Sequence, residues 1–207
     1  MITRCYLEIT NHCNLDCLFC PKTERAKHRL SLDEFELLTD KLIGKVEFLY
    51  FHLMGEPFLH PLLPQFIQIA RQKNFIPVLT TNGTLLSKAQ GVIEARPHKI
   101  QISLHSHEGN AKEHPEEYIH QVMTFAQEAA SQGILIVLRL WNEGGYDTTN
   151  DYIQDLIAQY QPRPWTQRHD GWKLSKNLYI EYDRMFEWPD AKHAEYDATD
   201  VFCYALR

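Results

Sequence analysis

The sequence has 207 residues, of which 44% are hydrophobic and 23% are charged. This composition excludes disordered and collagen-like chains, and the length favours one compact domain with a short appendage. The formal net charge of −6 does not indicate nucleic acid or an anionic membrane surface as a partner. Because the sequence shows no export signal and no apolar stretch near the ~20 residues that cross a bilayer, we expect a cytoplasmic protein.

Apolar runs of strand length alternate with segments of helical period along the chain. Strands are expected at 6–10, 46–54, 76–81, 99–105, 134–141 and 178–182. Helices are expected from the cap at 31 to 43, and at 63–73, 87–95, 115–132 and 149–160. Ser31 and Glu34 match a capping box at the start of the first helix. The stretch 161–176 has no clear period, and we expect it to be irregular.

This alternation of strands and helices is typical of an α/β fold with parallel strands and right-handed crossovers. The chain holds about six or seven such units, too few for a complete eightfold barrel of ~250 residues. An open or partial barrel, or a doubly wound sheet, is therefore expected. We divide the chain into a core of residues 1–182 and a C-terminal connector of residues 183–207.

Three of the five cysteines, Cys13, Cys17 and Cys20, directly follow the first predicted strand. In α/β folds, the loops at the carboxyl ends of the strands carry the chemistry. Three thiolates bind three irons of a [4Fe–4S] cluster and leave the fourth iron open to a substrate or cofactor, whereas electron-transfer clusters usually have four cysteine ligands. The alternative is a structural zinc site that is completed by His12 or His28.

The cysteines are separated by three residues and then by two, and an aromatic residue, Phe19, precedes the third. This motif resembles the signature of the radical SAM superfamily. Gly55-Glu56-Pro57 after the second predicted strand is similar to the family's glycine-glutamate motif, although Met54 stands where many members have another glycine. Segments 80–84 and 102–104 also resemble members of this superfamily.

The resemblance implies a partial (β/α)6 TIM-like barrel that binds one [4Fe–4S] cluster and S-adenosylmethionine (SAM). Cleavage of SAM by one electron would give a 5′-deoxyadenosyl radical, which abstracts hydrogen from a substrate. In this interpretation the cluster ligands are Cys13, Cys17 and Cys20, and Phe19 lies against the adenine. The other implied contacts to SAM are Gly55 and Glu56 at the amino group, Ser103 at the ribose or carboxylate, and Arg139 and Asn142 at the same ligand.

Two further groups of residues have both functional and ordinary interpretations. Lys22, Arg25, Lys27 and Arg29 form a basic segment that suits an acidic substrate or an electron donor such as flavodoxin or ferredoxin, but such a run is also typical of a solvated loop. His105 and His107 end the fourth predicted strand, where they are candidates for metal binding or acid–base work, or are exposed loop residues.

Cys203 lies in a segment that resembles the entrance to a SPASM domain, the extension in which many radical SAM enzymes bind auxiliary clusters. We therefore expect a core that continues into an auxiliary-cluster domain and acts on a peptide or protein. One alternative is a glycyl-radical-enzyme activase, a group that normally lacks this extension. The alternative from another class is a zinc-binding or regulatory module without redox chemistry.

Overall fold

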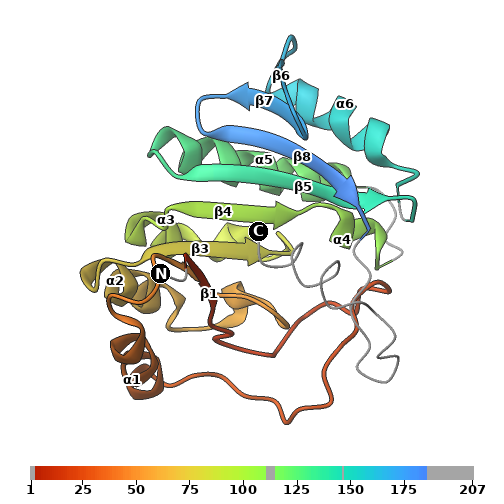
Figure 1. The fold of residues 1–207 in the computed structure, drawn as a ribbon. Helices are drawn as coiled ribbons and strands as arrows, with labels where there is room; N and C mark the ends of the chain where they lie inside the picture. Colours follow the sequence, from red (N-terminus) through yellow and green to blue (C-terminus); the bar gives the residue numbers. More distant parts are fainter. Residues whose placement is uncertain (1–2, 111–114, 146, 186–207) are drawn as a thin grey trace.

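The computed structural model describes residues 3–110, 115–145 and 147–185, and these form one mixed sheet with helices on one side (Figure 1). The strand order is β1-β2-β3-β4-β5-β8-β7-β6. The first six strands in this order are parallel to one another, while β7 and β6 are antiparallel additions. The strands are β1 (Arg4–Tyr6), β2 (Phe48–Tyr50), β3 (Ile76–Thr81), β4 (Lys99–Ser103), β5 (Leu135–Glu143), β6 (Thr166–Arg168), β7 (Gly171–Ser175) and β8 (Leu178–Arg184).

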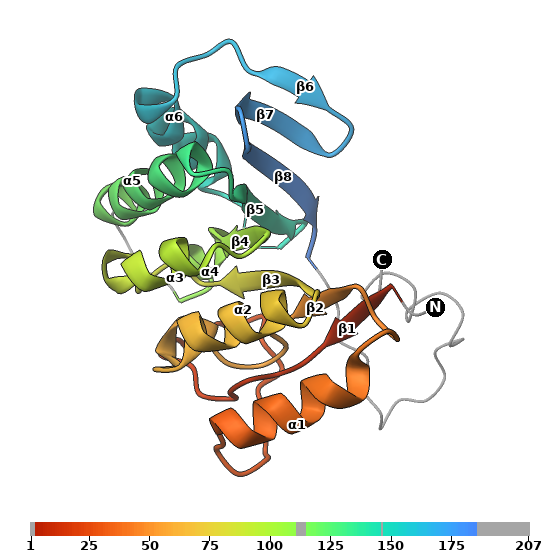
Figure 2. The same cartoon turned by 90° about the vertical axis from the view of Figure 1, so that its left-hand side faces the viewer.

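The helices cover one face of this sheet, as the side view shows (Figure 2). The crossovers contain α1 (Leu32–Leu42), α2 (Leu63–Gln72), α3 (Gln90–Ala95), α5 (Glu116–Ser131) and α6 (Asn150–Tyr160). Three short helical turns lie in the connections, namely η1 (Pro57–Leu59), η2 (Leu86–Lys88) and α4 (His105–Glu108). In the described part of the chain β1 and β6 are the two edges of the sheet, so the fold is the predicted α/β partial barrel rather than a closed one.

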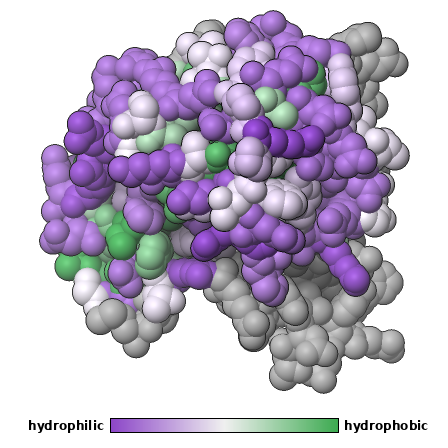
Figure 3. Space-filling model, turned by 90° about the horizontal axis from the view of Figure 1, so that it is seen from above, coloured by the Kyte–Doolittle hydropathy of each residue, from purple (hydrophilic) through white to green (hydrophobic). Residues whose placement is uncertain are grey.

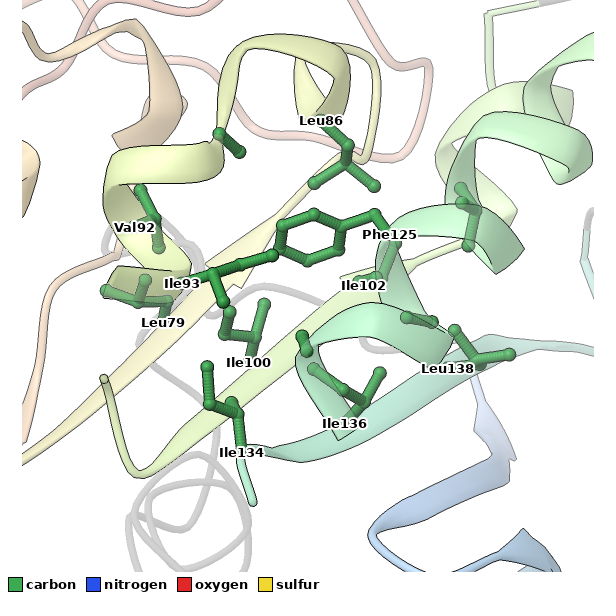
Figure 4. Packing of buried hydrophobic residues seen from close by; sticks show 14 of the residues in the cluster. Leu79, Leu86, Val92, Ile93, Ile100, Ile102, Phe125, Ile134, Ile136 and Leu138 are labelled. Atoms are coloured by element: carbon green, nitrogen blue, oxygen red, sulfur yellow. The ribbon is translucent and has the colours of Figure 1, made fainter. Parts of the chain in front are cut away.

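The hydrophobic core lies between the sheet and the helices (Figure 4). Leu79, Ile100 and Ile136 project from three neighbouring strands and are fully buried against Ile93 of α3 and Phe125 of α5. Successive side chains of a strand point to opposite faces of a sheet, so alternate residues face the helices. This packing fixes the register of the parallel strands, and with it the positions at which they end.

The structure confirms the predicted capping box and the bounds of one predicted strand, while another strand differs from the prediction. The predicted capping box is present: the Ser31 side chain accepts from the Glu34 N–H, and the Glu34 carboxylate accepts from the Ser31 N–H at 2.7 Å. Strand β3 has the predicted bounds, whereas β1 is shorter and earlier than expected, because the chain leaves the sheet after Tyr6. Thr10 pairs instead with Arg29 in an isolated bridge.

The expectation of an irregular stretch at 161–176 was wrong. Strands β6 and β7 form an antiparallel hairpin there, and β7 pairs with β8. All three residues of β6 are exposed and polar, so no apolar alternation indicates a strand, and polar residues are suited to a free sheet edge. Figure 3 looks down on this end of the molecule and shows a mainly hydrophilic surface. Among the described residues, none of the helices has both the length and the hydropathy needed to span a membrane.

Candidate functional site

The segment between β1 and α1 is an irregular loop that carries Cys13, Cys17 and Cys20 across the carboxyl ends of the strands. Asn11 closes this loop with its side-chain amide, which donates to the Ala26 carbonyl at 2.9 Å and accepts from the His28 N–H at 2.7 Å. We call residues 10–29 the cysteine loop. Its shape therefore depends on specific hydrogen bonds rather than on regular secondary structure.

The basic segment of the sequence holds the cysteine loop together. Lys22 Nζ donates to the Cys17 carbonyl at 2.8 Å, and Arg25 forms an ion pair of 2.7 Å with Glu8. Lys27 Nζ donates to another backbone carbonyl of the loop at 2.9 Å. These three cations thus have partners within the chain, which gives the segment a structural role in addition to any role in binding.

Burial raises the pKa of the Cys13 and Cys17 thiols, and the neighbouring cysteines add to the shift. Amide groups point at two of the sulfurs. Asn110 Nδ2 donates to Cys17 Sγ at 3.0 Å, and Asn82 Nδ2 lies 3.9 Å from Cys13 Sγ. The hydrogen bonds favour the thiolate, which is the form that binds metal.

The residue types of the cysteine loop suit an iron–sulfur cluster. Across the described residues, no three His, Cys, Asp or Glu side chains converge as the ligands of one ion would. In a [4Fe–4S] cluster each cysteine binds a different iron, so the sulfurs need only line one side of a larger group. Three neighbouring thiols on one loop, with N–H donors around them, match that requirement.

Gly55 lies directly against the cysteine loop, and only glycine fits there. Its φ is +85°, and a Cβ at this position would lie 2.5 Å from the Thr10 carbonyl oxygen and 2.8 Å from that of His12. The next residue, Glu56, donates its backbone N–H to the His12 carbonyl at 2.7 Å. The predicted glycine-glutamate motif and the cysteine loop are therefore in direct backbone contact.

The Glu56 side chain is buried, with 2% of its surface exposed, and it connects two strand ends. One oxygen accepts from the Phe58 N–H at 3.0 Å and from the Thr81 hydroxyl at 2.7 Å, and the other accepts from the Asn82 N–H at 2.7 Å. Burial raises the pKa of Glu56 to about 7, although these three hydrogen bonds oppose the shift. Its carboxylate thus positions the turn after β3.

Phe19 packs against the start and end of α4. Its ring lies 5.1 Å from the His105 ring, and a Cβ at Gly109 would overlap it. His105 itself is buried, burial lowers its pKa to about 4, and its Nδ1 lies 3.2 Å from the Arg139 carbonyl oxygen. The structure therefore places His105 and His107 in a helical turn rather than at the end of a strand.

Ser103 and Arg139 are paired in register on β4 and β5, and Glu181 of β8 is next in the same row. The Arg139 guanidinium lies 3.7 Å above the ring of Trp141, and its buried Nε has no hydrogen-bond partner in the described structure. Burial lowers the pKa of Arg139 to about 10, so the group stays charged at neutral pH. These strands thus bring together two of the predicted SAM contacts.

Asn142, the last of those predicted contacts, is buried near the end of β5. Its amide exchanges two hydrogen bonds with the Asn150 amide at the start of α6, at 3.0 and 3.1 Å. Its assignment to SAM stays a prediction. Cys203 and most of the predicted connector lie outside the described residues, so the auxiliary-cluster domain also stays a prediction.

Several residues that form the site at the carboxyl ends of the strands were not identified from the sequence. Glu8 accepts from Arg25 and also from the Met54 N–H at 2.9 Å, which joins the cysteine loop to the glycine-glutamate motif. Asn82 belongs to segment 80–84, which resembles the superfamily, but the sequence assigned it no role of its own, and Asn110 carried no signal at all. Their position after strand ends is a further feature that could have indicated them.

Comparison with known proteins places this geometry in a family. A family model described as the Radical SAM superfamily matches residues 7–149. GTP 3′,8-cyclase of Chlorobaculum tepidum is 33% identical over 109 residues, which are 47% of this chain and 31% of that protein. The tungsten-containing aldehyde ferredoxin oxidoreductase cofactor-modifying protein of Pyrococcus furiosus is 34% identical over 86 residues, 40% of this chain and 24% of that protein. The chain thus spans about a third or less of the length of these curated relatives.

Solved structures share the fold at low sequence identity. Streptococcus suis SuiB bound to S-adenosylmethionine has a TM-score of 0.58 at 15% identity, covering 77% of this chain and 38% of that chain. BtrN in complex with AdoMet and 2-DOIA has a TM-score of 0.52 at 21% identity, covering 67% and 56%. The family match includes the cysteine loop and the four parallel strands β2, β3, β4 and β5 that come after it in the chain, so this chain belongs to the radical SAM superfamily of enzymes.

Proposed function

We propose that this chain binds a [4Fe–4S] cluster through Cys13, Cys17 and Cys20 and binds SAM beside it. The observation that carries this proposal is the direct backbone contact between the Gly55-Glu56 segment and the cysteine loop. When bound, the two groups supply one-electron cleavage of SAM to a 5′-deoxyadenosyl radical that abstracts hydrogen from a substrate. The protein provides orientation and exclusion of water.

The Gly55-Glu56 segment serves the amino group of SAM through its main chain. Both oxygens of the Glu56 carboxylate accept hydrogen bonds from its own chain, which supports a positioning role for this side chain. The missing side chain at Gly55 lets the segment lie against the cysteine loop. Phe19, on the same loop, is the proposed contact to the adenine.

Arg139 and Ser103 serve the ribose or carboxylate of SAM. Arg139 is a half-buried cation with Glu181 beside it in the sheet, and its buried Nε has no hydrogen-bond partner in the described structure. A buried donor without a partner is costly. A carboxylate of the ligand would supply that partner, with Ser103 next to it in the same row of the sheet. Asn142 is the weaker proposed contact, because its amide already pairs with Asn150.

Anaerobic reconstitution with iron and sulfide tests the proposal. We expect a broad visible absorbance and, with dithionite and SAM, the formation of 5′-deoxyadenosine. Replacing any one of Cys13, Cys17 and Cys20 by Ala should abolish both signals. Cys5→Ala is the matched control, because Cys5 lies in β1 outside the loop, and it should retain both. Zinc instead of iron in the purified protein, with no 5′-deoxyadenosine, would favour the regulatory alternative.

We further propose a peptide or protein side chain as the substrate class. The support is a shared fold with SuiB, which has been solved with its precursor peptide SuiA at a TM-score of 0.58 and 15% identity. A peptide substrate should increase 5′-deoxyadenosine formation and lose mass in a SAM-dependent way. A glycine-centred radical signal in a partner protein, without a change in peptide mass, would favour the activase alternative.

The proposed electron donor is an acidic flavodoxin or ferredoxin that docks on the cysteine loop. Leu18 is 67% exposed beside Cys17, and the side chains of Lys22 and Arg25 are about half exposed nearby in sequence. An apolar residue among cations suits a negatively charged protein surface. Leu18→Glu should slow reduction by flavodoxin while reduction by dithionite is unchanged, and equal slowing of both would contradict the docking.

A further inference from the structure

Asn110 joins the end of α4 to the cysteine loop through every polar atom of its side chain. Its Oδ1 accepts from the Asp16 N–H at 2.9 Å. Its Nδ2 donates to the Ser106 carbonyl at 2.6 Å and to Cys17 Sγ at 3.0 Å. The side chain therefore has its full set of partners, one of which is a proposed cluster ligand.

The orientation of this amide is fixed by its surroundings. A backbone N–H can only donate, so the group that faces Asp16 must be the oxygen of Asn110. A backbone carbonyl can only accept, so the group that faces Ser106 must be the nitrogen. The second hydrogen of that nitrogen is then left for Cys17 Sγ, and the contact is a genuine N–H donor to sulfur.

Neighbouring contacts keep this donor in place. The Leu18 N–H donates to the Gly109 carbonyl at 2.9 Å, which ties the loop to the residue before Asn110. The Phe19 ring occupies the space beside Gly109 that a Cβ would need. Loop and α4 are thus connected by both backbone and side chain, and these contacts of the chain itself position the donor.

We propose that Asn110 is a positioning residue that raises the reduction potential of the cluster through its hydrogen bond to Cys17. The inference rests on the proposed cluster at the three cysteines. Reduction by one electron makes the cluster more negative, and an N–H donor to a ligand sulfur stabilises the more negative state. Asn82, at 3.9 Å from Cys13 Sγ, is a longer and weaker contact of the same kind.

A redox titration of the reconstituted protein, followed by EPR without SAM, tests this role. We expect Asn110→Ala to lower the equilibrium constant for reduction about tenfold, which is about 59 mV for a one-electron couple. Asn110→Asp keeps the acceptor for the Asp16 N–H but places a carboxylate oxygen near the sulfur, so its shift should be larger in the same direction. Gln121→Ala removes an exposed amide of α5 that bonds Glu117, and it should leave the potential unchanged.

The outcomes separate this inference from the proposed function. A wild-type protein that takes up no cluster would overturn the proposed function itself. A wild-type cluster whose potential matches those of Asn110→Ala and Asn110→Asp would overturn only the role of Asn110. Loss of the cluster from both variants, with a folded circular dichroism spectrum, would also overturn it, because the contact would then be needed for assembly rather than for the potential.

Discussion

Two regions of the molecule, the helix-covered face of the sheet and the carboxyl ends of its strands, are stabilised in different ways. On the helix-covered face, apolar side chains such as Phe35 and Phe66, stacked at 4.2 Å, are fully buried against one another. At the carboxyl ends of the strands, Glu56, Asn82 and Asn110 bind backbone groups and sulfur instead. The first region depends on volume and the second on donor and acceptor pairing, so substitutions in the two regions should have different consequences.

The largest expected effect is on the core, from Phe66→Ala in α2. Removing a fully buried aromatic side chain leaves a cavity and costs about 3–5 kcal/mol of unfolding free energy. Urea denaturation measures this loss. The folded fraction should still bind iron at the wild-type ratio, and a selective loss of iron per folded molecule would contradict the separation of the two regions.

Gly55→Ala should have the next largest effect, this time at the strand ends. The substitution strains a left-handed backbone and drives a Cβ into the Thr10 and His12 carbonyls, which should cost about 2–4 kcal/mol. Because the segment must move away from the cysteine loop, SAM binding to the reconstituted protein should also weaken. Calorimetry of SAM binding measures the second effect.

Gly44→Ala is the matched control for this substitution. Gly44 has a similar φ of +73°, but a Cβ there would have no atom within 4 Å. The strain alone should cost about 1 kcal/mol, and SAM affinity should be unchanged. Equal losses for Gly44→Ala and Gly55→Ala would show that the contact with the cysteine loop does not matter.

Glu56→Gln changes hydrogen bonding at nearly constant volume. Glutamine has one acceptor oxygen where three donors now converge, so at least one buried donor loses its partner, at a cost of about 1–3 kcal/mol. We expect the turn at Asn82 to loosen and SAM affinity to fall. A stability equal to that of the wild type would indicate that the carboxylate is not required at this strand end.

The smallest effect is a pH dependence of stability that Glu56 contributes. Burial raises its pKa in the folded state from 4.5 to about 7, so the folded state holds a proton that the unfolded state has already lost. This contribution is complete below pH 4.5 and is lost as the pH rises to about 7. Urea denaturation of wild type and Glu56→Gln at pH 5 and pH 7 isolates it, because glutamine does not titrate. An identical pH dependence in the two proteins would contradict it.

The sequence predicted those parts of the fold that have local causes. Strand β3 has its predicted bounds, and the Ser31 capping box is present, because each depends on neighbouring residues. The β6–β7 hairpin could not be predicted, since the side chains of Thr166, Gln167 and Arg168 are exposed and show no apolar alternation. The overall α/β architecture followed from the alternation of strands and helices.

The candidate site shows the same division. The cysteine spacing and Gly55-Glu56 are continuous motifs that the sequence could indicate, and the structure brings them into backbone contact. Their roles toward a cluster and SAM stay predictions. Asn110 contacts Asp16 and Cys17 from 94 and 93 residues away, and a partnership at that separation leaves no local signal. The hydrogen bonds and the ion pair by which the basic residues stabilise the cysteine loop also depend on the folded geometry.

The long separation between Asn110 and its partners has a consequence for the order of events during synthesis. A ribosome that adds about 5–20 residues per second needs about 5 to 20 seconds to make the 93 residues between Cys17 and Asn110. Until then the cysteine loop lacks the Asn110 amide that bonds to Asp16 and Cys17. The thiols are therefore made long before the structure that shelters them, and oxidants or foreign metals have that interval in which to react.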